Sequence, residues 1–407
     1  MASTTATATD RDTATATDTA TALCTASEQD AGALTVDALV DATPASRDRF
    51  VDLLRALSIL VVVLWHWVFS VTHWTSAGAL TMPNPVGDVR LLWLATWLLQ
   101  VMPLFFLVGG FSHLAAWDAS RRRGGTAREF LRSRLQRLFR PVAVHLAVWA
   151  AVDATARALV SDYPGVLHWG RVVFVPLWFL AIYAGVVLLV PATAWLHRHD
   201  RVRTIVGLGV AIALADLGRF RFGVDALGYA NAALVFVFAH QLGYFWRDGR
   251  LTAPDADARS RRGALIVGGL SALVVLTNLG VYPRSMVAVR GEAVSNMFPT
   301  TACIAALAVL QLGVVLTLRP VAERWLAGRS IWRVVVAANG VAMTVFTWHM
   351  TALVLAIGAF TALGGHLGDQ ATASWWATRP LWVLGPGAIL AGLVALFSRF
   401  ERPARPR

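Results

Sequence analysis

An arginine and a histidine stand eleven residues apart in an otherwise uncharged apolar stretch, RALSILVVVLWH, residues 55–66. Eleven residues of α-helix turn through about 1,100°, roughly 20° more than three full turns, so Arg55 and His66 share one face. They are separated along the axis by about 16 Å. An arginine can pair with an anionic oxygen, and a neutral histidine can take a proton. The spacing therefore places a cation and a titratable ring on one face of a predicted helix.

Other polar residues extend this face. Asp52 lies within about 60° of it, and we expect Ser70 and His73 to continue it toward the far end of the helix. Each residue also has a simpler interpretation, because Arg55 can snorkel to the membrane interface and His66 can be a hydrogen-bonded histidine between helices. Polar groups at such depth usually face a cavity or a partner, so several on one face favour a functional cavity.

The composition is that of a membrane protein. Of 407 residues, 57% are hydrophobic and 15% are charged, against about 25% charged in a soluble domain. Apolar stretches near 20 residues, long enough to cross about 30 Å of hydrocarbon, recur along the chain. The sequence predicts an all-α, polytopic transmembrane helical bundle of about ten spans, at 53–72, 91–115, 141–160, 174–196, 204–217, 227–246, 263–281, 299–318, 337–363 and 380–398.

The distribution of arginine predicts the topology. With the N-terminus inside, the inner loops and tail carry 24 arginines and the outer loops carry seven, which fits the positive-inside rule. We expect residues 1–48 to be a disordered, low-complexity cytoplasmic tail, 49–400 to be a ten-helix membrane domain, and 401–407 to be a basic cytoplasmic tail. The expected location is the cell membrane. The net charge of +12 is explained by these loops, so no nucleic-acid partner is expected.

A basic segment and a second histidine are further candidates. Arg134, Arg137 and Arg140 are spaced by three and fall on one side of a helix. They are either a topology determinant that touches anionic lipid or a clamp for phosphate groups. His349 is central in its span and on its own is most simply a packed, hydrogen-bonded histidine.

Other residues are given no chemical role. His113, His145 and His240 fall near inner helix ends and are interpreted as interfacial, and Trp65 and Trp67, which flank His66, as lipid-packing. The ten histidines and two cysteines show no spacing typical of a metal site, so none is expected.

Several motifs resemble one family. RFVDLLRALSILVVVLWHW, residues 49–67, resembles the first helix of the acyltransferase-3 family of membrane acyltransferases, with Asp52, Arg55 and His66 at the family's Asp, Arg and His positions. VMPLFFLVGGFSHL is similar to the family's second-helix segment, where relatives often have Ser-Gly in place of Gly109-Gly110. Further resemblances follow in family order, in RSRLQRLFRP (132–141), PLWFLAIY (176–183) and MTVFTWHM (343–350), the last carrying His349.

The resemblance implies a bacterial membrane-bound O-acyltransferase that moves an acyl group, most commonly acetyl, from cytoplasmic acyl-coenzyme A to a hydroxyl of a glycan or another envelope or secreted acceptor. Acyl-coenzyme A would be a co-substrate, with no bound cofactor. His66 would act as general base or accept the acyl group itself, and both routes stay open. Arg55 would hold the donor's thioester carbonyl or phosphates, and Asp52 would orient Arg55. Arg134, Arg137 and Arg140 would bind coenzyme A, and His349 and Ser70 would line the cavity.

Two other functions are considered. A proton-coupled secondary transporter could use the intramembrane arginine and histidine, but such proteins often show repeated halves, and no internal repeat is found. A catalytically inactive member of the family could serve as a membrane scaffold, although the motif residues are present.

Overall fold

The computed structural model describes residues 35–44, 47–249, 251–253 and 255–401. The predicted disordered tail falls mainly on residues 1–34, and the predicted basic tail on 402–407, both outside the described residues. The chain divides into two units, Met1–Arg47 and Asp48–Arg407. In the first unit, the described part contains helix α2, Val36–Asp41, whose N-terminus is capped by the side chain of Thr35.

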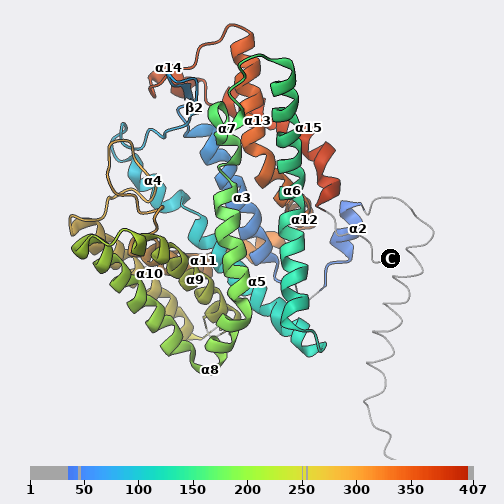
Figure 1. The fold of residues 1–407 in the computed structure, drawn as a ribbon. Coiled ribbons are helices and arrows are strands. Elements are labelled where there is room, and N and C mark those ends of the chain that lie inside the picture. Colours follow the sequence, from blue (N-terminus) through green and yellow to red (C-terminus); the bar gives the residue numbers. More distant parts are fainter. Residues whose placement is uncertain (1–34, 45–46, 250, 254, 402–407) are drawn as a thin grey trace, which may run out of the picture. The chain divides into compact units, whose positions relative to one another are not determined.

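The second unit is built from helices (Figure 1). Its short strands, β1 and β2, pair as an antiparallel hairpin. In chain order its elements are α3 Arg49–Val68, β1 His73–Trp74, β2 Leu80–Thr81, α4 Leu92–Leu99, α5 Met102–Arg122, α6 Ala127–Leu159, α7 Val166–Trp169, the 3-10 helix Arg171–Phe174, α8 Leu177–Phe222, α9 Ala226–Arg247, α10 Ala256–Asn278, α11 Ala302–Leu326, α12 Arg329–Gly340, α13 Ala342–Ala362, α14 Ala373–Ala377, α15 Leu381–Phe397 and the 3-10 helix Ser398–Phe400.

Among the described residues, nine helical elements are long and apolar enough to cross a membrane. One of them, Arg171–Phe222, has 52 residues, or about 78 Å of helix, more than twice the hydrocarbon thickness. Its helix is broken at Asp200, which has φ −153° and ψ 92°. The Asp200 carboxylate accepts a hydrogen bond from the Arg203 amide at 2.9 Å and so caps the second half. The two halves of this element coincide with the predicted spans 174–196 and 204–217, and the prediction of an all-α polytopic bundle is confirmed.

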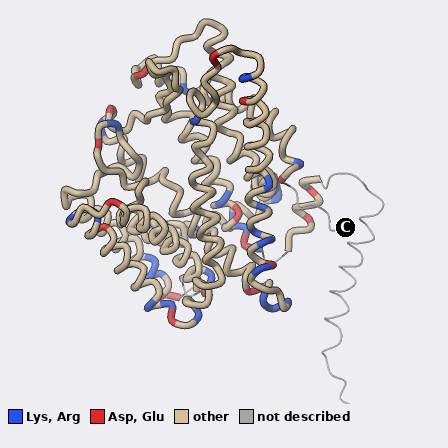
Figure 2. The backbone as a smooth tube through the Cα atoms, viewed as in Figure 1, with Lys and Arg blue, Asp and Glu red and all other residues tan. Residues whose placement is uncertain are grey.

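Charge is distributed as a multi-pass membrane protein requires. Figure 2 shows long uncoloured stretches through the middle of the helices and charged segments mainly at helix ends and connections. Many arginine-bearing segments lie in the lower half of that view, near the α5–α6 connection and the bend in α8. A low-charge belt between charged ends is what a bilayer imposes, because ionised side chains are costly in hydrocarbon.

Helices α3 and α5 lie between two groups, one formed by α8 to α11 and the other by α6, α13 and α15 (Figure 1). Helices α5 and α9 cross in close contact. A Cβ atom on Gly110 would overlap the carbonyl oxygen of His240, and one on Gly243 would overlap the carbonyl oxygen of Leu107. Small residues allow membrane helices to approach this closely, so Gly110 and Gly243 set the distance between α5 and α9.

The first membrane helix is shorter at its far end than predicted. It ends at Val68, with Phe69 as its C-cap, so Ser70 and His73 leave the helical face that they were expected to extend. Ser70 is buried just beyond the helix, and His73 lies in β1. The polar face of the helix therefore consists of Asp52, Arg55 and His66.

Two segments near the predicted outer ends of the helices, one of which includes α4, are joined by hydrogen bonds. The amide of Met286 donates to the Thr96 hydroxyl at 2.9 Å, and the Trp97 indole donates to the Arg284 carbonyl at 2.8 Å. Asn84 donates to the Ala288 carbonyl at 2.7 Å. We call these two segments, residues 84–100 and 284–297, the outer clasp.

Candidate active site

The structure brings the two predicted histidines into direct contact. His66 on α3 and His349 on α13 are 283 residues apart in sequence, and the His66 Nδ1 atom lies 3.1 Å from the His349 Nε2 atom. The two ring centroids are 5.1 Å apart. The His349 side chain is fully buried, whereas that of His66 is partly exposed. His349 is therefore the more deeply buried of the two and contacts His66 from inside the bundle.

The surrounding groups determine where the protons lie. His349 Nδ1 is 2.7 Å from the Phe346 carbonyl oxygen, which can only accept, so His349 Nδ1 carries a proton and donates it. In a neutral ring the His349 Nε2 atom is then an acceptor, and His66 Nδ1 is the donor to it. This assignment leaves the lone pair of His66 on Nε2, the nitrogen that faces away from His349.

His66 borders a cavity of about 150 Å³. Most of the lining is apolar or aromatic, and Thr96 and Gln100 are its other polar members. Val287 and Met297 of the outer clasp form part of the wall. The remaining lining residues are Val62, Trp65, Leu99, Val101, Met102, Val175, Pro176, Trp178, Phe179 and Phe346.

Of the two tryptophans beside His66, Trp67 is buried and not placed to pack against lipid, whereas Trp65 is half-buried. The Trp67 indole donates a hydrogen bond of 3.1 Å to the His349 carbonyl oxygen. Trp65 borders the cavity and stacks on Phe69 with ring centroids 4.5 Å apart. Trp65 therefore forms part of the cavity wall beside His66, and Trp67 ties α3 directly to α13.

Arg55 is held at two points. One guanidinium nitrogen donates to Asp52 at 2.9 Å, and the other terminal nitrogen donates to the Ser112 hydroxyl of α5 at 2.8 Å. Asp52 and Arg55 are thus in direct contact, and the role of Asp52 in orienting Arg55 stays a prediction. The sequence interpretation missed Ser112, whose only signal was its position in the second-helix motif, two residues after Gly110.

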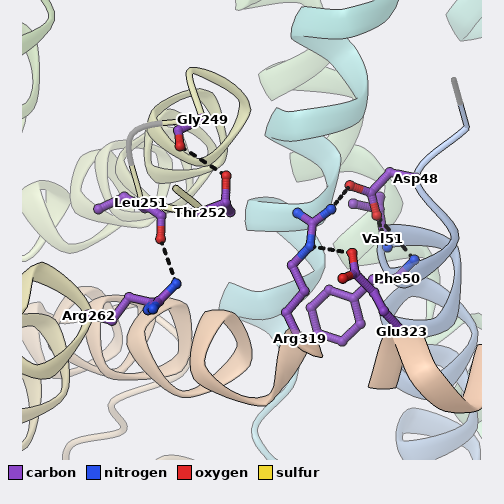
Figure 3. A network of polar contacts seen from close by, with 9 residues as sticks. All are labelled: Asp48, Phe50, Val51, Gly249, Leu251, Thr252, Arg262, Arg319 and Glu323. Carbon is purple, nitrogen blue, oxygen red and sulfur yellow. Dashed lines mark hydrogen bonds and ion pairs between the residues drawn. The ribbon is translucent and has the colours of Figure 1, made fainter. Parts of the chain in front are cut away.

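The N-terminus of α3 is fixed to α11 (Figure 3). One carboxylate oxygen of Asp48 caps the helix by accepting from the amides of Phe50 and Val51, both at 3.1 Å. The other oxygen pairs with Arg319 at 2.9 Å, and Arg319 also pairs with Glu323 at 2.7 Å. Because Asp52 and Arg55 follow within two turns, this network positions them relative to α11.

A second polar cluster lies behind Arg55. His113 Nδ1 and His240 Nε2 are 3.0 Å apart, and the Tyr183 hydroxyl is 3.3 Å from His113 Nε2. Both histidines are buried between helices, so the interpretation of them as interfacial is wrong. The close approach of α5 and α9 at Gly110 allows this contact. Arg55 and Arg134 both act electrostatically on His113 and Tyr183.

The predicted residues are only partly gathered together. Arg134 is half-buried on α6, and Arg137 and Arg140 are exposed on the same helix. Arg134 and Arg137 are both close enough to Tyr183 to interact with it electrostatically. Ser70 is buried but does not border the cavity at His66. His145, predicted to be interfacial, is buried with its ring 4.9 Å from that of Trp348. Within the described part of the chain, no group of three or more histidine, cysteine or acidic residues could hold a metal.

Comparison with known proteins gives one match. The acyltransferase-3 family model, described as an acyltransferase domain, matches residues 48–398. Neither the curated proteins nor the solved structures gave a match. The matched segment contains the Asp52–Arg55 pair, both histidines of the contact and the arginines of α6. The chain therefore belongs to the acyltransferase-3 family, as its motifs predicted.

Proposed function

We propose that the protein is a multi-pass O-acyltransferase that moves a short acyl group, acetyl, from acyl-coenzyme A to a hydroxyl of a glycan or another envelope or secreted acceptor. The proposal rests on one observation above all, the chain of hydrogen bonds from His66 through His349 to the Phe346 carbonyl. That chain leaves the lone pair on His66 Nε2, in a residue that borders a cavity.

In the proposed reaction His66 is the general base. The acceptor oxygen attacks the thioester carbonyl carbon while His66 Nε2 takes the hydroxyl proton. The new C–O bond forms, the C–S bond breaks, and the proton passes from His66 to the departing thiolate, which leaves as the free thiol of coenzyme A. His349 is a positioning residue, because it fixes the tautomer of His66 and accepts a hydrogen bond from the cation that forms.

In this proposal acyl-coenzyme A binds at the end of α3 that carries Arg55. Asp52 and Ser112 hold the guanidinium in one orientation, so its remaining N–H groups can bind a phosphate oxygen of the donor while the thioester reaches His66. Arg134 and Arg137, which act on the same Tyr183, extend the positive charge toward the predicted cytoplasmic side. They would bind the phosphates of coenzyme A, with Arg140 at the exposed end of the row.

Cavity size supports a short acyl group. The cavity at His66 has a volume of about 150 Å³, below the roughly 300–1,000 Å³ of most small-molecule sites. A cavity of this size is in keeping with an acetyl group and one reacting hydroxyl. The excess of arginine on the predicted inner side supports a cell-membrane protein with both termini in the cytoplasm, where acyl-coenzyme A is made.

The experiment is donor turnover by purified protein in nanodiscs supplied with labelled acetyl-coenzyme A and a crude envelope extract. Wild type should release free thiol, and His66→Ala should lose turnover at least a thousandfold. His199→Ala, which changes an exposed histidine beside the α8 bend, serves as the matched control and should match wild type.

Two outcomes would change the proposal. Label that stays on wild-type protein but not on His66→Ala would replace general-base catalysis with a covalent acyl-histidine. Full turnover by His66→Ala would reject the proposed mechanism, and counterflow of a substrate in liposomes without acyl transfer would favour a transporter instead.

A further inference from the structure

A larger cavity lies at the outer ends of α13 and α15, beside α14, and has a volume of about 800 Å³. Part of its wall is apolar and comes from two helices that are long and apolar enough to cross the membrane, through Ala356 and Phe360 of α13 and Leu384 and Pro386 of α15. The rest of its wall is polar and includes Arg379. It shares no lining residue with the cavity at His66.

Arg379 is a buried cation at this cavity. The residue is only 8% exposed. Its guanidinium carbon lies 3.7 Å from the ring centroid of Trp375 and 5.6 Å from that of Trp382. It donates to the Trp375 carbonyl at 2.9 Å and to the Thr378 hydroxyl at 3.4 Å. Among the described residues, the ion pairs found do not include one to Arg379.

These contacts do not balance the charge. Burial lowers the pKa of the Arg379 guanidinium to about 10, so the group is still a cation at neutral pH. Stacking on tryptophan offsets only part of the cost of desolvating an unpaired cation. The two tryptophans and the Trp375 carbonyl fix the guanidinium in place, and its Nη1 N–H groups have no hydrogen-bond partner among the described residues. A fixed, buried cation of this kind is suited to an anionic ligand.

We propose that this cavity binds the phosphate of a lipid from the outer leaflet, with Arg379 contacting the phosphate and the groove between α13 and α15 taking part of the acyl chains. The planar guanidinium matches two phosphate oxygens at once. The polar residues around Arg379 and the apolar residues of α13 and α15 line the same cavity. One cavity can therefore contact both the phosphate and the acyl chains of a lipid. Asp369 lines the same cavity and disfavours a ligand with many negative charges.

The test is a binding titration followed by native mass spectrometry on the full-length protein in detergent. Three probes separate the parts of the ligand: dioleoyl phosphatidic acid, dioleoylglycerol without phosphate, and glycerol 3-phosphate without chains. Wild type should bind phosphatidic acid at one saturable site, at least tenfold more tightly than either other probe. The measurement needs no acyl transfer, so its failure is distinguishable from a failure of the proposed function.

Four variants locate the site. Arg379→Gln should weaken phosphatidic acid binding at least tenfold, whereas Arg379→Lys should retain most of it. Gly385→Phe should also weaken it, because the ring enters the apolar part of the cavity, at a position where a Cβ atom meets nothing within 4 Å. Arg290→Gln changes an exposed arginine that does not line the cavity and should bind as wild type does.

Three results would overturn the proposal. Equal binding of phosphatidic acid to wild type and Arg379→Gln would remove the phosphate contact. Equal binding of dioleoylglycerol and phosphatidic acid would make the site purely apolar. Tight binding of glycerol 3-phosphate that Gly385→Phe leaves unchanged would make the occupant a soluble anion. If Arg379→Gln fails to fold, the binding of phosphatidic acid to Gly385→Phe tests whether a lipid occupies the cavity, and unchanged binding overturns the proposal.

Discussion

The His66 Nδ1 atom lies 3.1 Å from the His349 Nε2 atom. This contact joins α3 to α13, two helices whose histidines are 283 residues apart in the sequence. His349 is itself held by the Phe346 carbonyl, and its own carbonyl oxygen accepts from Trp67 on α3. The contact is therefore supported on both sides. It gives His66 a defined tautomer, which an isolated membrane histidine would not have.

The role of His349 can be tested by replacing its acceptor. In His349→Gln the side-chain oxygen can still accept from His66 Nδ1, whereas in His349→Ala it cannot. We expect turnover to fall by roughly tenfold in the first variant and roughly a hundredfold in the second, the range typical of residues that orient a reacting ligand. Thiol release measured across pH should also show a changed profile in His349→Ala alone. Equal turnover in both variants and wild type would exclude the positioning role.

The hydrogen bond from Arg55 to Ser112 gives a second prediction. Ser112→Ala should raise the KM for acyl-coenzyme A about tenfold with a smaller change in kcat, because a charged hydrogen bond contributes about 1.5–3 kcal/mol to holding the arginine. Ser58→Ala is the matched control, since the buried Ser58 hydroxyl bonds to the Leu54 carbonyl of its own helix at 2.7 Å. An unchanged KM in Ser112→Ala would show that Arg55 does not depend on α5 for its orientation.

The crossing of α5 and α9 gives a third prediction. Gly110→Ala places a methyl group against the His240 carbonyl and should force the helices apart, at a cost of about 1–3 kcal/mol. Thermal unfolding in detergent should detect this as a lower midpoint. Gly185→Ala is the control, because a Cβ atom there meets nothing within 4 Å. Similar midpoints for both variants would mean that the two helices are not in tight contact at Gly110.

The start of α3 gives a fourth prediction. Asp48→Ala should destabilise the fold by about 0.5–2 kcal/mol through loss of the helix cap. Combining it with Arg319→Gln in a double-mutant cycle should show a coupling of up to about 1 kcal/mol, since the ion pair is partly exposed. Reversible unfolding in mixed micelles provides the measurement. A coupling of zero would assign the whole effect to the cap.

Helical periodicity explains why part of the site was predictable. The positions of Asp52, Arg55 and His66 on one face follow from 3.6 residues per turn, and the Asp52–Arg55 pair is an ordinary i, i+3 contact. The bend in α8 was also predictable, because a charged HRHDRVR segment interrupts two apolar stretches. Both features depend only on local sequence.

The contacts between helices were not predictable in the same way. His66 and His349 meet because α3 packs on α13, and His113 and His240 meet because two glycines let α5 approach α9. Periodicity within one helix carries no information on which helix faces it. The end of α3 at Val68 was missed as well, because neither glycine nor proline follows it to mark the end.

The outer clasp has a consequence for competing reactions. Water is itself a hydroxyl compound that a base such as His66 could activate, and each such event would waste one acyl group by hydrolysis. The clasp places Val287 and Met297 in the cavity wall, and a few hydrogen bonds from Asn84, Thr96 and Trp97 hold it there. In the proposed reaction, an apolar wall at this position would keep water away from the acyl group and so favour its transfer over its hydrolysis.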